Sequence, residues 1–362
     1  MSSELSTAQE LEAVVGARTD AGTYKSIPFL DEHCASMLAR SPLTVLGHVR
    51  ADGSLGTVLI GGNAGHAAPV TPTELALPAL VLDDRAVDDR AVDDGALVDG
   101  APVGLLSVVP GYGETLRING RLSLGGATPS VVIEEAFVHC AKAIIRSKLW
   151  KDESIVAPSS GDAVIEVSGG AECLDHPAVR AFLAASPFVT LASVDGDERA
   201  DVSPKGDPAG FVHVLDGGRL AVPDRPGNLR TDTLHNLLDQ PALSLLALVP
   251  GSDHVLEVAG RAIVTDDDAL REALVVNDKV PLAAVVIAAT RVDLRRSTAI
   301  EASALWDTSR HIEPGSLPRA SQMWSDHVQL HAGLGVDEDA ERLVPVDGLH
   351  EGIQENYRDG LY

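Results

Sequence analysis

The chain contains two copies of one domain-sized segment. Residues 104–121 (GLLSVVPGYGETLRINGR) match residues 244–261 (SLLALVPGSDHVLEVAGR) at a constant offset of 140 residues. The same offset continues without a gap through residues 80–103 and 220–243, and residues 41–46 match residues 186–191. A period of about 145 residues is a domain length, well above the roughly 20 to 50 residues of a solenoid unit. The sequence therefore predicts a duplicated domain.

The boundaries follow from where the match ends. Leu149-Trp150 matches Leu305-Trp306 at the end of each copy. We expect copy 1 at residues 28–150, a linker at residues 151–170, copy 2 at residues 171–306 and a C-terminal tail at residues 307–362, with a helix over residues 317–334.

The composition indicates a globular protein with two ordinary cores. The chain has 362 residues, of which 45% are hydrophobic, and a net charge of −25 without a basic stripe. This charge argues against nucleic acid or an anionic membrane as the main partner. Cys34, Cys140 and Cys173 have no metal-site spacing and favour a reducing compartment. No apolar run reaches transmembrane length and no signal peptide is visible, so a cytoplasmic protein is expected.

Short strands dominate the periodicity of each copy. In copy 2 we expect small helices at residues 230–238 and 266–279, and one at HPAVRAFLA capped by Asp175. Six or so antiparallel strands with two or three small helices predict a closed barrel, because closure removes exposed strand edges. The expected strands of copy 2 are residues 188–194, 200–203, 211–215, 219–222, 243–249, 255–265 and 283–292.

Two segments carry groups suited to an anionic ligand. In copy 2, DVSPKGD (residues 201–207) precedes DRPGNLR (residues 224–230), where Arg225 and Arg230 flank a Pro-Gly turn at the start of a predicted helix. Forked donors, free backbone N–H groups and a helix dipole suit a phosphate monoester. The plainer alternative is a surface turn whose arginines pair with aspartates. In copy 1, EEAFVHCAKAIIRS (residues 134–147) carries His139, Lys142 and Arg146, or is simply a strand entering a helix with solvated basic residues.

Other chemistries find no support in the sequence. The acidic tract at residues 83–99 lacks the glycine and distal glutamate of a calcium loop, and its phrase DDRAV is a short tandem duplication. His139 and Cys140 are adjacent, so they point apart on regular structure. No GxSxG motif is present. We therefore expect no metal site and no hydrolase chemistry.

The motifs together resemble the pyridoxamine 5'-phosphate oxidase-like FMN-binding split barrels, particularly a bacterial group of FMN-dependent enzymes. Copy 2 carries DVSPKGDPAGFV, LAVPDRPGNLRTDTLHNLL and VPG, copy 1 carries the closing segment EEAFVHCAKAIIRSKLW, and the terminal YRDGLY also resembles the family. The resemblance covers nearly all of residues 28–362. It implies a mainly β chain of two tandem six-stranded Greek-key barrels with small helices, and FMN bound between two barrels.

The copies have diverged in complementary ways within this resemblance. Residues opposite the copy 2 phosphate motif are changed in copy 1: opposite Asp201, Ser203, Lys205, Asp207 and Asn228 stand Thr57, Leu59, Gly61, Asn63 and Asp88, although Arg85 and Arg90 remain. Residues opposite the closing segment are changed in copy 2: opposite His139, Lys142 and Arg146 stand Arg295, Thr298 and Ala302. If each site combines the phosphate motif of one copy with the closing segment of the other, only one of the two possible sites keeps both parts. We expect an intrachain pseudo-dimer with one FMN site.

The resemblance implies an FMN-dependent oxidoreductase acting on a small molecule. Arg225, Arg230 and Asn228 would hold the phosphate, with Ser203 and Lys205 nearer the isoalloxazine ring. The remaining cofactor-binding candidates are Asp207, His139, Lys142 and Arg146. Two alternatives stay open: a haem-binding or haem-degrading barrel that uses His139 or His235, and a non-catalytic flavin-binding protein.

Overall fold

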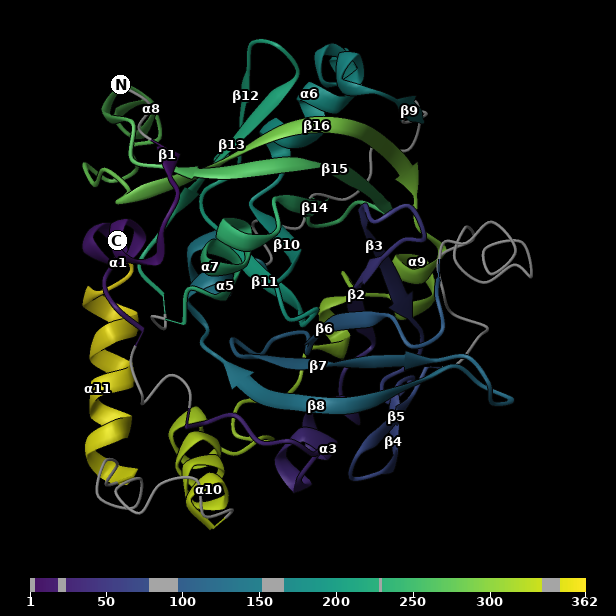
Figure 1. Ribbon diagram of the computed structural model, residues 1–362. Coiled ribbons are helices and arrows are strands. Elements are labelled where there is room, and N and C mark those ends of the chain that lie inside the picture. Colours follow the sequence, from purple (N-terminus) through teal and green to yellow (C-terminus); the bar gives the residue numbers. More distant parts are fainter. Residues whose placement is uncertain (1–3, 19–23, 78–96, 152–165, 228–229, 334–345) are drawn as a thin grey trace.

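The chain is mainly β, with two antiparallel sheets and short helices (Figure 1). The computed structural model describes residues 4–18, 24–77, 97–151, 166–227, 230–333 and 346–362. The strands of copy 1 are β2 (Leu43–Val49), β3 (Leu55–Gly61), β4 (Ala68–Thr71), β5 (Glu74–Ala76), β6 (Pro102–Val108), β7 (Thr115–Ser123) and β8 (Ser130–His139). Those of copy 2 are β10 (Phe188–Val194), β11 (Ala200–Gly206), β12 (His213–Leu215), β13 (Arg219–Asp224), β14 (Ala242–Leu248), β15 (His254–Thr265) and β16 (Ala283–Arg296).

The two sheets have the same strand order. Copy 1 runs β3-β2-β6-β7-β8-β5-β4, and copy 2 runs β11-β10-β14-β15-β16-β13-β12. Both long hairpins also carry an irregularity at the same glycine, between Asn119 and Gly120 in copy 1 and between Ala259 and Gly260 in copy 2. The predicted mainly β fold of two equivalent units is confirmed, with a seventh strand in each path. We call the units barrel 1 and barrel 2.

The strand register corrects one part of the sequence alignment. Leu43 pairs with Gly61 in barrel 1, and its equivalent Phe188 pairs with Gly206 in barrel 2. The residues opposite Asp201, Ser203, Lys205 and Asp207 are therefore Gly56, Val58, Ile60 and Gly62, and the expected Thr57, Leu59, Gly61 and Asn63 are wrong by one residue. A one-residue slip exchanges the two faces of a strand, so only the hydrogen-bonded ladder fixes it.

A second correction concerns the offset upstream of β6. Glu74 pairs with Val132, and Arg219 pairs with the equivalent Ala288, so Leu75 corresponds to Leu220 at an offset of 145 residues. The ungapped match of residue 80 with residue 220 is thus wrong. The change from 145 to 140 equals the length of the repeated phrase DDRAV in copy 1. Arg85, Asp88 and Arg90 lie in this segment, outside the described residues.

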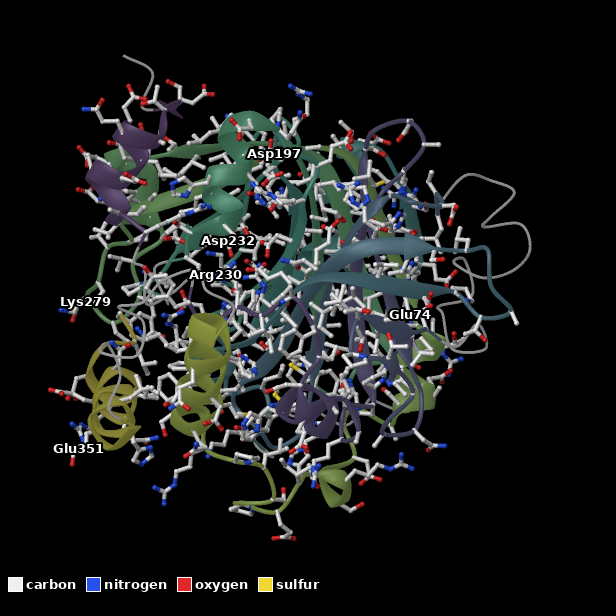
Figure 2. All side chains as sticks on the ribbon, turned by 60° about the horizontal axis from the view of Figure 1, so that its bottom comes forward. Glu74, Asp197, Arg230, Asp232, Lys279 and Glu351 are labelled. Carbon is white, nitrogen blue, oxygen red and sulfur yellow. The ribbon has the colours of Figure 1, made fainter. Side chains whose placement is uncertain are left out.

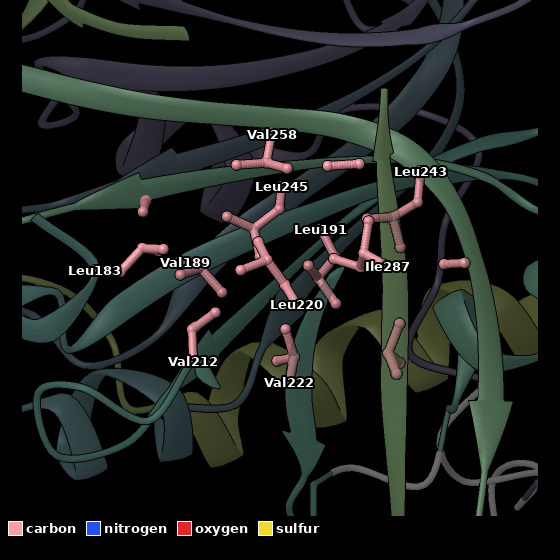
Figure 3. Close-up of a cluster of buried hydrophobic side chains, with 14 of the residues drawn as sticks. Leu183, Val189, Leu191, Val212, Leu220, Val222, Leu243, Leu245, Val258 and Ile287 are labelled. Carbon is pink, nitrogen blue, oxygen red and sulfur yellow. The ribbon is translucent and has the colours of Figure 1, made fainter. Parts of the chain in front are cut away.

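Each barrel has its own apolar core. In barrel 2, Leu191, Leu245 and Ile287 meet between the strands (Figure 3). Barrel 1 has the equivalent cluster around Leu46, Leu105 and Ile118. Each fully buried side chain of this size contributes about 1.5–3 kcal/mol, so every barrel is stabilised largely from within.

A third apolar cluster joins the barrels around a pseudo-twofold axis. It contains equivalent residues of both, such as Leu106 with Leu246 and Val108 with Leu248. The rings of Trp150 and Trp306 lie 6.1 Å apart, and their Nε1–H groups donate to the equivalent carbonyls of Tyr112 and Ser252. These paired contacts have the self-complementary form of a twofold dimer interface. The barrels therefore form a pseudo-dimer within one chain.

Short helices flank this interface. They are α5 (Lys142–Ser147), α9 (Thr298–Ser303) and α7 (Asp232–Asp239). A Cβ atom on Gly206 of β11 would lie 2.0 Å from Ala143 O of α5, and one on Gly61 of β3 would lie 2.1 Å from Ala299 O of α9. Each barrel thus packs the helix that follows its last strand against a glycine of the other barrel.

Segments outside the barrels are attached to them. β1 (Glu4–Leu5) pairs with β15, and β9 (Val167–Gly169), within the expected linker, pairs with β16. The other helices are α1 (Ala8–Val15), α3 (Glu32–Leu38), α6 (Pro177–Ala185), α8 (Asp268–Ala273), α10 (Ala320–Gly333) and α11 (Val346–Asp359). Among the described residues, no helix combines the length and the apolar character needed to cross a membrane.

Two helix expectations need correction. The first turn of α6 is capped by the His176 side chain, which accepts from Ala178 N, and not by Asp175, which ends a preceding 3₁₀ turn. The helix expected over residues 266–279 covers only α8. The predicted helices in residues 230–238 and 317–334 are present as α7 and α10.

Candidate functional site

A cavity between the barrels brings together the two sequence segments singled out above. Including the part open to solvent, it measures about 850 Å³. Barrel 1 contributes Arg117, His139, Lys142 and Arg146 to its lining. Barrel 2 contributes Ser203, Lys205, Asp224, Arg225, Arg230 and Asp232. Seven of the nine predicted cofactor-binding residues therefore meet in one place.

The lining is strongly cationic in an acidic protein. Among the described lining residues there are six arginine and lysine side chains and two carboxylates, whereas the whole chain has a net charge of −25. Cations buried together repel one another and lose hydration, so such a cluster needs anions nearby. Four of the six already pair with carboxylates: Arg117 with Asp201, Lys205 with Asp224, Arg225 with Asp207 and Arg230 with Asp232. Among the described residues, Lys142 and Arg146 have no carboxylate partner, so these two cations favour a negatively charged ligand.

Helix α7 begins at this cavity. Its first residues, from Thr231 to Leu234, line the space. Thr231 precedes the helix with a left-handed φ of 51° and makes no side-chain capping hydrogen bond. An uncapped N-terminus presents free N–H groups and the positive end of the helix dipole. This end of the cavity therefore suits a phosphate.

Arg225 is held in place by groups behind the cavity. Its Nε donates to Asp207 at 2.7 Å, Nη2 donates to Leu274 O at 2.7 Å, and Nη1 donates to Lys279 O at 3.2 Å. Asp207 is fully buried and does not line the cavity. Asp207 is thus a positioning residue for Arg225. A guanidinium has five N–H donors, so two remain for a ligand.

Lys142 faces the cavity without an acidic partner. It is the first residue of α5 and is 4% exposed. Burial lowers the pKa of its ammonium group. Among the described residues, no side chain or carbonyl hydrogen-bonds or ion-pairs with Lys142. Arg146, one turn later, donates from Nε to Leu361 O at 2.6 Å and from Nη2 to Pro226 O.

His139 is a neutral imidazole at the end of β8. Burial lowers its pKa well below the ordinary value, and the charges of Arg117 and Lys25 add to this effect. Its Nδ1 lies 3.1 Å from Cys140 O, which fixes Nδ1–H as the donor and leaves Nε2 with a lone pair. His235, the other histidine considered from the sequence, faces Glu12 and does not line the cavity.

Arg230 lies deeper in the cavity than we expected for a residue that binds the phosphate. It donates to Glu135 and Asp232, each at 2.8 Å, and lies over the Phe137 ring at 4.0 Å. Figure 2 shows Arg230 and Asp232 next to each other. The same ring faces Arg117 and Lys25. Arg230 thus belongs to a buried charge cluster at the inner end of the cavity.

Sequence reasoning missed Arg117, which is 1% exposed and ion-pairs with Asp201 across the barrels. The sequence does contain an indication that this residue is functional, because Arg117 aligns with Glu257 inside the best-matched block of the repeat. A reversal of charge within such a block indicates that the two copies differ in function at this position.

Tyr362 was also missed; its ring lies 5.6 Å from Arg225 and 5.8 Å from Arg146. Asn228 lies outside the described residues.

The pseudo-equivalent place on the other side of the axis has a different character. Glu257, equivalent to Arg117, ion-pairs with Arg50 at 2.9 Å and accepts from Thr57 N at 3.0 Å. Arg295, equivalent to His139, lies 3.3 Å from Asp293, which replaces Phe137. Charged side chains pair across the barrels on both sides of the axis. The difference is that the uncharged Thr298 and Ala302 stand here at the positions of Lys142 and Arg146.

Comparison with known proteins points to one family. Residues 175–304 match the family model for pyridoxamine 5'-phosphate oxidase. No curated protein matches the chain. Among solved structures, HupZ of Group A Streptococcus is 17% identical, with 33% of this chain and 93% of that chain covered and a TM-score of 0.28.

Two further structures are similar to this chain. A pyridoxamine 5'-phosphate oxidase-type protein from Lactobacillus delbrueckii is 25% identical, with 29% of this chain and 82% of that chain covered and a TM-score of 0.24. Another from Corynebacterium glutamicum is 15% identical, with coverage of 38% and 98% and a TM-score of 0.26. The family match covers the whole of barrel 2 from α6 to α9. Over these residues, barrel 2 is therefore similar to the pyridoxamine 5'-phosphate oxidase family.

Proposed function

We propose that the chain is an FMN-dependent oxidoreductase that acts on a small molecule and has one flavin site between its barrels. The observation that carries this proposal is Lys142, a buried ammonium group that has no acidic partner among the described residues, in a cavity shared by both barrels. Next to it stand Arg146, Arg225 and the uncapped start of α7. This set fits the phosphate of FMN, because charge-assisted donors and free backbone N–H groups converge on one volume.

The chain's residues divide into two groups along the cavity. Lys142, Arg146 and Arg225 would hold the phosphate, with Asp207 orienting Arg225 from behind. Ser203, Lys205 and His139 would lie along the ring. FMN, when bound, supplies a ring that accepts and donates hydride or electrons. The surrounding cations would stabilise negative charge at that ring, and the barrels would exclude water from it.

The small molecule bound to the purified protein tests this proposal. We expect flavin absorbance and the mass of FMN in the extracted ligand, and recovery of flavin binding when FMN is added back to the stripped protein. Anaerobic reduction of the bound flavin followed by reoxidation with candidate acceptors would show turnover. A protein that binds no flavin, or that binds it without any redox turnover, contradicts the oxidoreductase assignment; the second result indicates a flavin-storing protein.

His139 supports one other cofactor. A neutral imidazole with a lone pair on Nε2 is the form that ligates haem iron, and the nearby cations would suit the haem carboxylates. The same absorption spectrum separates the two proposals, because a Soret band would appear in place of the flavin bands. His139→Ala would abolish that band but would leave a flavin spectrum in place.

A further inference from the structure

A second group of ligand-type side chains lies away from the flavin cavity. Asp31 stands at the start of α3, Cys34 lies in its first turn, and His327 comes from α10 near the other end of the chain. The carboxylate oxygen, the thiol sulfur and an imidazole nitrogen of these residues all lie within 4.8 Å of one another. Cys34 and His327 are fully buried. Three different donor atoms thus converge from two distant segments.

The imidazole of His327 points its free nitrogen at this group. Its Nδ1 lies 3.0 Å from Lys25 O, and a carbonyl accepts only from Nδ1–H. In the neutral ring Nε2 then carries a lone pair. Nε2 has no hydrogen-bond partner among the described residues, and it lies 3.2 Å from Asp31 Oδ2. Two lone-pair atoms at this distance need a positive charge between them.

A proton or a metal ion could supply this charge. A proton on His327 would make an ion pair with Asp31 and would leave the Cys34 thiol unused. A divalent ion would engage all three donors, and the two negative ligands would balance its charge. Carboxylate oxygen, imidazole nitrogen and thiolate sulfur are all established ligands of Zn²⁺. The carbonyl of Lys25 would act as the supporting acceptor that orients a metal-bound histidine.

We propose that Asp31, Cys34 and His327 form a zinc site that fastens α10 to barrel 1. Three protein ligands leave the fourth tetrahedral position for water. Oδ1 of Asp31 already accepts from Cys34 N at 2.9 Å, which holds the first two ligands in register. A neighbouring contact between His33 and Asp326, at 2.7 Å, joins the same two helices and keeps His327 close. No metal site was expected from the sequence, because ligands this far apart in the chain form no spacing motif.

The full-length protein, freed of metal by a chelator, provides the test. We expect it to take up one Zn²⁺ per chain and to unfold at a higher temperature with zinc than without. Cobalt(II) in place of zinc should give a thiolate-to-cobalt charge-transfer band. Failure of the wild-type protein to bind zinc stoichiometrically, or a cobalt complex without this band, would overturn the proposal in favour of the Asp31–His327 ion pair.

Variants assign the ligands. Cys34→Ser should remove the charge-transfer band, and His327→Gln should weaken zinc binding by more than the roughly 10- to 100-fold that loss of a supporting residue causes. Cys173→Ser, at a cysteine outside the group, is the matched control and should behave as wild type. Unchanged zinc affinity in both Cys34→Ser and His327→Gln would also refute the site. A variant that does not fold leaves the wild-type cobalt spectrum as the deciding measurement. No step of this test depends on bound flavin.

Discussion

At the scale of single residues, the free-energy cost of burying an unpaired charge indicates that Lys142 binds a negatively charged ligand. Lys142→Met should weaken FMN binding by about 10- to 150-fold, because a hydrogen bond to a charged group contributes roughly 1.5–3 kcal/mol. The same change should not lower the stability of the flavin-free protein, since it removes a buried cation that meets no carboxylate in the part of the chain that the structure describes. Titration with FMN and urea unfolding measure the two effects. Thr298→Ala, at the equivalent position, should leave FMN affinity unchanged; equal losses in both variants would argue against the assignment.

His48 gives a residue-scale prediction about pH. Burial, and then the charge of Arg50, lower its pKa from 6.5 to about 4. Between pH 6.5 and 4 the unfolded chain therefore takes up a proton that the native chain refuses, so stability falls as the pH falls. The contribution has a slope of up to about 1.4 kcal/mol per pH unit. Urea unfolding of His48→Asn should show a shallower loss in this window and a parallel curve above pH 7. Identical slopes throughout would mean that His48 titrates normally.

At the scale of elements, the contact between α5 and β11 positions the cations of barrel 1. Gly206→Ala would place a methyl group 2.0 Å from Ala143 O and should push α5 away. Such overpacking costs about 1–3 kcal/mol of stability, and it should also weaken FMN binding, because α5 carries Lys142 and Arg146. Gly61→Ala makes the equivalent clash with α9. We expect a similar stability loss there but normal FMN affinity; a comparable loss of affinity would show that the two interfaces are coupled.

At the scale of the whole molecule, the asymmetry of the pseudo-dimer sets the stoichiometry. Charged pairs occur on both sides of the axis, but only the cavity side has Lys142 and Arg146, which have no carboxylate partner among the described residues. On the other side, the uncharged Thr298 and Ala302 stand at these positions, so a phosphate would lack both cations there. FMN titration of the stripped protein should therefore saturate at one equivalent per chain. Saturation at two tight equivalents would require a second site that this charge distribution disfavours.

The sequence alone determined the duplication and the mainly β architecture. Those features depend on local information: alternating apolar residues, turn glycines and the long matching block that ends at Arg121 and Arg261. The same block also contained the reversal of charge between Arg117 and Glu257. Most of the candidate site was accessible from the sequence for this reason, since its residues lie in short segments that differ between otherwise similar copies.

Only the tertiary structure determined the register between the strands and how deeply each side chain is buried. The strand ladder moved the equivalents of Ser203 and Lys205 by one residue, because hydrogen-bond pairing between strands leaves no mark in one strand's sequence. Burial placed Asp207 behind Arg225 and moved Arg230 into an inner ion-pair cluster. The packing of α10 on α3 brought His327 to Asp31 and Cys34. These outcomes depend on contacts between distant segments, which sequence patterns of short range cannot encode.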